Sequence, residues 1–251
     1  MFRLSGTIPL SRRWHAAGAK NDSPSPSAEH IVNESAVMIQ NDADLFETSE
    51  PRPKSLKAIG DAIQACRRCP IGCNGTDAVM GEGPKAAALM IVGEQPGDVE
   101  EQQGRPFVGP AGRLLDAHLE QAGIDDSRVY VTNAVKHFKF VQRGKRRLHQ
   151  SPTAREIDIC RWWVESERAI VQPQLVLALG ASAARGMLGK TVSIGKARGM
   201  PHPLADGGEL WVTAHPSYLL RLQDEAKDEQ ERLFDADLAA VAERLAELQD
   251  A

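Results

Sequence analysis

The chain has 251 residues, of which 42% are hydrophobic and 25% charged, so it has the length and composition of one large globular domain or two small ones. Its 30 Lys and Arg residues against 34 Asp and Glu residues give a net charge of −4, which argues against a protein coated in basic charge but leaves room for a local basic patch. No run of about eighteen apolar residues occurs, so the sequence predicts no transmembrane helix and no membrane partner.

The N-terminal region differs from the rest of the chain. Ser, Asp, Glu and Asn dominate from Asn21 to Glu50, and no hydrophobic period is visible there. This composition predicts a disordered polar tail over residues 1–52 and one folded domain over residues 53–251. Several cations and no acidic residue precede Asp22, which leaves an organelle transit peptide open as a second interpretation of the tail.

Four short apolar runs predict the strands of one sheet. Each is nearly continuous in apolar residues, as is typical of strands buried on both faces. They are Ala87–Val92, Val129–Thr132, Leu175–Leu179 and Leu210–Thr213.

Helical patterns lie between and after these runs. They cover Pro110–Gly123, Thr153 to Gln172, Ala181–Leu188 and a last helix from about Asp224. The second of these opens with the capping-box pair Thr153 and Glu156. The alternation of strands and helices predicts an α/β fold, a three-layer α/β/α sandwich around a short, mostly parallel four-stranded sheet.

Polar side chains follow three of the four predicted strands. In an open parallel sheet, ligands bind beyond the carboxyl ends of the strands, so these positions predict an active site. The segments are Gly93-Glu94-Gln95-Pro96-Gly97-Asp98, Asn133-Ala134-Val135-Lys136-His137 and His215-Pro216-Ser217, while Gly180 follows the remaining strand.

A glycine-rich loop, Gly104–Gly112, lies ahead of the first predicted helix. Its glycines allow close backbone approach to a ligand, although tight-turn packing explains them equally well. The loop matches neither the dinucleotide-binding G-x-G-x-x-G motif nor a P-loop. Phe107 in this loop is interpreted either as a core residue or as a stacking platform for a planar ligand.

The segment from Lys136 to Arg155 is strongly basic. It carries a charge of +7 without a single acidic residue, which leaves −11 on the remainder of a chain whose total is −4. A solvated charged loop is one interpretation, but this concentration favours contact with a phosphate backbone. The cations are Lys136, Lys139, Arg143, Lys145, Arg146, Arg147 and Arg155.

Three of the four cysteines crowd into eight residues. Cys66, Cys69 and Cys73 form this group, and Cys160 stands alone. Such clustering indicates metal binding before it indicates disulfides. The spacing fits a structural iron–sulfur or zinc site without deciding between them, and reduced free thiols are the alternative.

In combination, these motifs resemble the family 4 uracil-DNA glycosylases, which are iron–sulfur enzymes of the uracil-DNA glycosylase superfamily. The resemblance extends from about Leu56 to the final helix. It rests on Gly93–Asp98, Gly104–Gly109, Thr132–Lys136 and His215–Arg221.

Within that family the chain is most similar to the UdgX group, through Gln95, the segment His137–Phe140 and the loop Gly144–Pro152. UdgX proteins excise uracil and stay covalently attached to the resulting abasic sugar through a loop histidine. His149 occupies that place here.

The resemblance implies a role for each site residue. The implied ligands of a [4Fe–4S] cluster are Cys66, Cys69, His137 and Cys160, with Cys73 as a competitor of His137. The implied catalytic residues are His149, Glu94, His215 and Asp98. The implied substrate-binding residues are Gly93, Gln95, Phe107, Asn133, Ser217 and Arg221, and the implied contacts to the DNA backbone are Lys145, Arg146 and Arg147.

These roles predict an enzyme that acts as a cytoplasmic, nucleoid-associated monomer on uracil-containing DNA, preferably single-stranded. Phe107 would stack on uracil, Asn133 would read its edge, His215 would bind O2, and His149 would attack C1′ in place of water. Two alternatives stay open, an ordinary glycosylase that uses water as the nucleophile and a non-catalytic iron–sulfur protein that binds DNA. An electron-transfer protein is the weakest, because the basic loop and the His215 motif would then have no role.

Overall fold

The structure is a computed structural model that describes residues 51–250. The predicted tail over residues 1–52 and its transit-peptide alternative therefore lie outside the described residues, except for the last two positions of the tail. No described helix combines the length and apolar character needed to cross a membrane.

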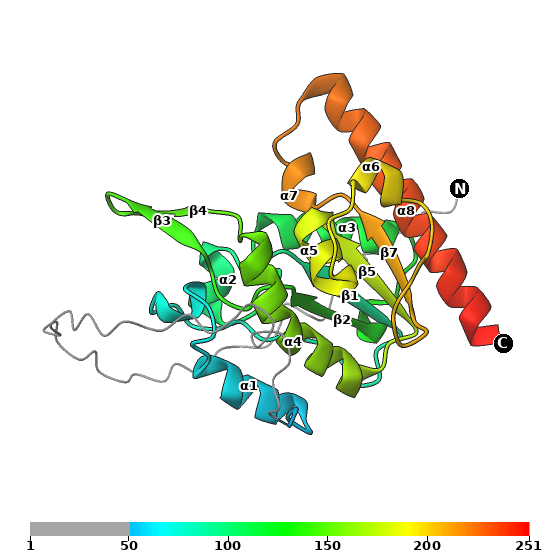
Figure 1. Ribbon diagram of the computed structural model, residues 1–251. Helices are drawn as coiled ribbons and strands as arrows, with labels where there is room; N and C mark the ends of the chain where they lie inside the picture. Colours follow the sequence, from blue (N-terminus) through cyan, green and yellow to red (C-terminus); the bar gives the residue numbers. More distant parts are fainter. Residues whose placement is uncertain (1–50, 251) are drawn as a thin grey trace, which may run out of the picture.

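The centre of the domain is a five-stranded sheet (Figure 1). Its order is β2-β1-β5-β7-β6, and the first four strands run parallel while β6 is antiparallel to β7. The strands are β1 (Leu89–Gly93), β2 (Val129–Asn133), β5 (Leu175–Leu179), β6 (His202–Pro203) and β7 (Glu209–Thr213). All four predicted strands are confirmed. The prediction missed the two-residue edge strand β6, which is too short to show a pattern.

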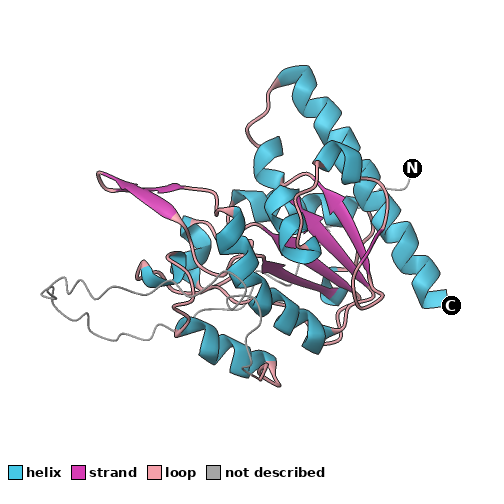
Figure 2. Ribbon diagram, in the orientation of Figure 1, coloured by secondary structure: helices cyan, strands magenta, loops and turns pink. Residues whose placement is uncertain are grey.

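Helices cover both faces of this sheet, which confirms the predicted three-layer fold (Figures 1 and 2). Side chains of β1 alternate between two cores, with Met90 and Val92 in one and Leu89 and Ile91 in the other. The first core is covered by α1 (Leu56–Gln64), α4 (Ala154–Val171), α5 (Gly180–Leu188) and α6 (Ile194–Ala197). The second is covered by α3 (Pro110–Gln121), α7 (Pro216–Leu219) and α8 (Asp224–Asp250).

The ends of α4 follow from its sequence. The Thr153 side chain accepts from the backbone of Glu156, and the Glu156 carboxylate accepts from the backbone of Thr153, so the predicted capping box is formed. Gln172 ends the helix in a left-handed conformation with φ 51°, immediately before Pro173. These two caps define where α4 begins and ends.

A separate antiparallel hairpin projects from the body of the domain (Figure 2). It consists of β3 (Phe140–Arg143) and β4 (Arg146–His149), joined by a two-residue turn in which Gly144 has φ 61°. Phe140 at its start pairs with His149 at its end. The hairpin therefore brings His149 back to the base of the segment, beside the central sheet.

The order of the strands reverses direction at β1. The chain passes from β1 to β2 on one side and then crosses to β5 on the other side. In open α/β sheets this switch between neighbouring strands leaves a crevice at their carboxyl ends, where ligands bind.

Candidate active site

A cavity of about 630 Å³ lies at the carboxyl edge of the sheet, where the strand order reverses. This volume is that of a typical small-molecule site. Every strand of the parallel sheet contributes to it through the residues that follow it or end it, which confirms that these segments meet at one edge. Its polar lining includes Glu94, Gln95, Asn133, His149, Ser182, His215, Ser217 and Arg221.

Three side chains form a chain of contacts at this cavity. The Oγ of Ser182 donates to Oε2 of Glu94 at 2.5 Å, and Nε2 of His149 lies 3.2 Å from Oε1 of the same carboxylate. Burial alone would raise the pKa of Glu94, but hydrogen bonds from His149 and Ser182, together with the nearby His215, hold it below its usual value. Glu94 is therefore a carboxylate at neutral pH and can accept a proton from His149.

The ring of His215 is held as a neutral donor. Its Nδ1 accepts from the backbone N–H of Ser217 at 3.1 Å, because His215 is the N-cap of α7. An accepting Nδ1 leaves the ring proton on Nε2. Burial lowers the pKa of His215 to about 4 against the opposing pull of Glu94, so the ring carries no charge at neutral pH.

An aromatic floor is built from Phe107. This side chain lines the cavity although it is only 6% exposed, so it is both a core residue and a surface of the site. Its backbone has φ 55°, an uncommon conformation for an aromatic residue that persists only where the surroundings impose it. Gly112 leaves the required space, because a Cβ there would lie 1.7 Å from the Phe107 carbonyl oxygen.

Asn133 at the end of β2 faces the same space. A Cβ on Gly93 would lie 2.4 Å from Oδ1 of Asn133 and 2.6 Å from Cζ of Phe107. Glycine at position 93 therefore lets an amide and an aromatic ring approach each other across the end of β1. An amide that both donates and accepts, beside an aromatic face, suits a flat heterocycle with hydrogen-bonding edges.

Gln95 lines the cavity, but its side chain acts on the hairpin. Its Nε2 donates to the carbonyl oxygens of Lys139 and Gln150, both at 3.2 Å, and its Oε1 accepts from the backbone N–H of Lys139 at 3.3 Å. These three hydrogen bonds join the segments that enter and leave the hairpin. The side chain therefore fixes the position of β4 and His149, and the expected role of Gln95 in substrate binding stays a prediction.

Asp98 and Arg147 lie together, away from their expected places. Asp98 does not line the cavity; its carboxylate accepts from Nε of Arg147 at 2.5 Å and from Gln102 at 2.9 Å. Arg147 also contacts Glu101 at 2.7 Å and lies over the rings of Phe138 and Phe140. These groups pair with each other and attach the hairpin to α2 (Asp98–Gln103), and their expected roles at the sugar and the DNA backbone stay predictions.

The basic segment is less accessible than its charge suggests. Lys136 is fully buried and contacts Glu167 at 2.6 Å and Thr132 at 2.5 Å, while Lys139 contacts Glu156 at 2.7 Å. Arg155 is not free either. The predicted phosphate-binding surface therefore contracts to the hairpin tip, where the exposed cations without an ion pair inside residues 51–250 are Arg143, Lys145 and Arg146.

The cysteines meet on the first core, beside α4. Cys66 lies close enough to Cys69, and both lie close enough to Cys160, to help raise the pKa of Cys69 and of Cys160. Burial is the larger cause, and it raises the pKa of Cys160 to about 12. Trp163 donates to Sγ of Cys66 at 3.3 Å, and the backbone N–H of Lys136 donates to Sγ of Cys160 at 3.4 Å. Sulfurs that accept hydrogen bonds are suited to act as thiolate ligands.

His137 lies against this group. A Cβ on Gly72 would be 3.7 Å from its Cε1, and its buried Nε2 has no hydrogen-bond partner within the described part of the chain. Cys73 is exposed, with its Sγ near the Arg67 carbonyl. Within residues 51–250, no three His, Cys, Asp or Glu side chains are close enough to bind one metal ion together. A cubane cluster spreads its four ligands over separate iron atoms, so wider spacing suits it better than zinc.

Ser182 is the contact residue that the sequence interpretation missed. It lies three residues after the end of β5, where the glycine that follows the strand is the only feature that the sequence interpretation uses. Its position beyond the carboxyl end of a parallel strand is the signal that could have identified it.

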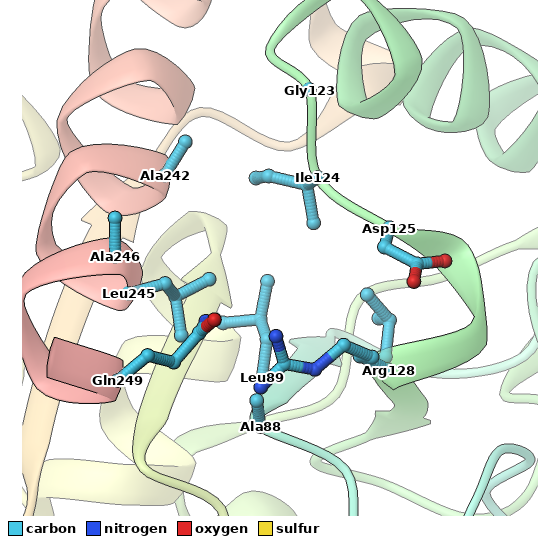
Figure 3. A pocket seen from close by; sticks show the side chains of 11 residues that line it. Ala88, Leu89, Gly123, Ile124, Asp125, Arg128, Ala242, Leu245, Ala246 and Gln249 are labelled. Carbon is cyan, nitrogen blue, oxygen red and sulfur yellow. The ribbon is translucent and has the colours of Figure 1, made fainter.

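A second cavity of about 220 Å³ lies near the other end of the strands, between α8 and the loop after α3 (Figure 3). Ile124, Leu89 and Leu245 form its apolar wall, with Asp125 and Arg128 at its rim. It contains neither a histidine nor a cysteine. The larger cavity, where histidine, carboxylate and amide groups converge, is therefore the candidate active site.

The segment that carries this cavity is similar to known proteins. Residues 80–239 match the family model described as the uracil DNA glycosylase superfamily. The type-4 uracil-DNA glycosylase of Thermotoga maritima is 37% identical over 171 residues, which cover 68% of this chain and 85% of that protein. The type-4 uracil-DNA glycosylase of Pyrobaculum aerophilum is 31% identical over 173 residues, which cover 66% of this chain and 85% of that protein.

Proposed function

Because the chain belongs to the uracil-DNA glycosylase superfamily, we propose that it excises uracil from DNA and that His149 then bonds covalently to C1′ of the abasic sugar. The observation that carries the second step is the contact between Nε2 of His149 and Oε1 of Glu94, at 3.2 Å, on the wall of the cavity. A histidine paired with a carboxylate is the arrangement expected of an activated nucleophile. The proposal assigns the protein to the UdgX type.

Uracil enters the cavity as an extruded base, because the glycosidic bond is out of reach inside a duplex. Phe107 stacks on its face, and the Asn133 amide pairs with O4 and N3–H. Cytosine carries the opposite donor and acceptor pattern on this edge, so it would leave buried groups unpaired. A single strand requires no unpairing, which favours single-stranded DNA as the substrate.

Cleavage of the C1′–N1 bond leaves its electron pair on uracil and positive charge on the sugar. The Nε2–H of His215 donates to O2, where the negative charge develops. The Glu94 carboxylate offsets the charge on the sugar. The Asp98 carboxylate binds Arg147 on the hairpin that carries His149.

Attack by His149 completes the reaction. The ring nitrogen that does not face Glu94 uses its lone pair to bond to C1′, and the proton on the other nitrogen passes toward Glu94. The C–N bond formed to His149 replaces the C–N bond broken to uracil. Because the new bond is stable, the protein reacts once. Arg143, Lys145 and Arg146 at the hairpin tip, with Arg221 at the cavity, hold the DNA backbone.

We assign the thiols of Cys66, Cys69 and Cys160, together with His137, as the ligands of a [4Fe–4S] cluster. The unpartnered Nε2 of His137 supports this ligand set over one that includes the exposed Cys73. A cluster here supplies cross-links between distant segments, and no step of the reaction uses its electrons. The protein acts as a cytoplasmic monomer in this proposal.

The test is a reaction with a single-stranded oligonucleotide that contains one uracil, analysed on a denaturing gel. The parent protein gives an SDS-resistant complex, and uracil release stops at one equivalent. His149→Ser loses the complex but still releases uracil, with water as the nucleophile. His202→Ser, on the edge strand, is the matched control and reacts like the parent.

Two results would overturn the proposal. A His149→Ser variant that crosslinks as well as the parent removes His149 as the nucleophile. A parent protein that turns over many equivalents without a complex is an ordinary glycosylase, in which water reaches C1′ beside the half-exposed His149 ring.

A further inference from the structure

We infer that Ser182 is a positioning residue for the Glu94–His149 pair: its hydroxyl holds one carboxylate oxygen so that the other faces the His149 ring. The inference rests on the proposed function, because it assigns Ser182 to the same reaction.

The fold places Ser182 beside Glu94 through strand pairing. β1 and β5 are neighbouring parallel strands, so the residue after β1 lies next to the first turn of α5, which follows β5 directly. Gly180, with φ 87°, makes the turn into that helix, and a Cβ there would approach Cβ of His215 to 3.2 Å. Ser182 is thus brought to the cavity by backbone geometry.

The hydrogen bonds fix both oxygens of the carboxylate. An ionised carboxylate only accepts, so the hydroxyl of Ser182 is the donor to Oε2 at 2.5 Å. Oε1 faces His149 from β4. With partners on two different elements, the carboxylate has no freedom to turn away from the ring.

Ser182 differs from the other groups that face Glu94. These are the imidazole rings of His149 from the hairpin and His215 from the junction of β7 and α7. Arg221 lies close enough to His215 to help lower its pKa. The serine hydroxyl keeps its proton throughout the pH range of the reaction, so it orients the carboxylate whatever the charge on the rings.

The role in the reaction is that of a fixed support for proton transfer. When one nitrogen of His149 bonds to C1′, the ring becomes cationic and its remaining N–H is shared with Oε1. Ser182 holds Oε1 in line with that proton and keeps its own hydrogen on Oε2. The serine therefore contributes without exchanging a proton or forming a bond.

The first experiment follows the side-chain carboxyl carbon of Glu94 by NMR during a pH titration of the free protein, with Glu94→Gln for assignment. We expect Ser182→Ala to move the midpoint to higher pH, because the ionised form loses a donor. Ser182→Thr keeps a hydroxyl and restores the parent midpoint. This readout requires no DNA, so it is independent of the proposed reaction.

The second experiment measures the rate of complex formation in a single turnover. We expect Ser182→Ala to lower the rate of complex formation about tenfold at neutral pH. Between pH 8 and pH 5, the factor by which the rate falls is at least about three times as large in Ser182→Ala as in the parent. Ser182→Thr recovers the parent profile. Ser193→Ala, at the start of α6 where the side chain forms no capping hydrogen bond, leaves the profile unchanged.

The results separate this inference from the proposed function. An unchanged Glu94 midpoint and an unchanged pH profile in Ser182→Ala overturn the role of Ser182 while the crosslinking reaction stands. If Ser182→Ala changes the Glu94 midpoint but the parent protein forms no complex with DNA, the hydrogen-bond role of Ser182 is confirmed and the proposed reaction is refuted.

Discussion

At the scale of single residues, the site depends on where protons are held. The backbone of Ser217 determines which nitrogen of His215 carries the proton, and burial keeps that ring neutral. Glu94 is kept ionised by hydrogen bonds from His149 and Ser182, which outweigh its burial. A neutral donor, His215, and an ionised acceptor, Glu94, are thus fixed in a single cavity.

His215 makes stability depend on pH in a defined window. Its pKa falls from 6.5 to about 4 on folding, so the folded protein binds fewer protons at this ring than the unfolded chain does between these values. Its effect on stability is constant above about pH 6.5, and stability is lost as the pH falls toward 4. We expect the melting temperature, measured by calorimetry, to fall less between pH 7 and pH 4.5 in His215→Asn than in the parent. Equal losses would contradict a buried neutral ring.

Residues next to a strand end were predictable, and those paired over long distances were not. Glu94, Asn133 and His215 each follow or end a buried strand, so the topology alone brings them together. Asp98 occurs in the same motif as Glu94, yet its partner Arg147 is 49 positions away in the chain. No local pattern in either segment specifies that ion pair, so the sequence could not predict it.

At the scale of elements, the hairpin is the segment that the sequence did not reveal. The predicted strands are apolar because they are buried, whereas β3 and β4 are largely exposed and polar. Tertiary contacts form it instead, chiefly the Gln95 amide at its base and Arg147 against α2. The position of His149 is therefore a property of the contacts around the hairpin.

Replacement of the Gln95 amide tests this dependence. Gln95→Met keeps the length of the side chain but removes all three hydrogen bonds to the hairpin base. We expect faster amide hydrogen exchange over residues 139–150 and complex formation slowed by about tenfold, because His149 is less often in place. Gln103→Met, on the exposed side of α2, is the control. Unchanged exchange in Gln95→Met would show that other contacts suffice.

At the scale of the whole molecule, the four expected cluster ligands come from three parts of the chain. Cys66 and Cys69 follow α1, His137 follows β2, and Cys160 lies in α4. His137 and Cys160 also flank the hairpin segment. A cluster bound there would cross-link the layer of helices to the sheet and fix both ends of the hairpin segment.

Iron content distinguishes the two candidates for the fourth ligand. We expect Cys73→Ser to retain full iron, labile sulfide and visible absorbance, because its thiol is exposed and apart from the buried group. His137→Ala loses iron, melts at a lower temperature and exchanges faster across the hairpin. The reverse pattern would make Cys73 the ligand.

The buried contact between Lys136 and Glu167 also limits how this protein can evolve. Both side chains are fully enclosed, so a mutation that neutralises one leaves the other as an uncompensated charge, at a cost of about 3–5 kcal/mol. A pair of apolar residues of matching volume is tolerated far better. Descendants of this sequence are thus expected to keep both residues or to exchange both within a short interval.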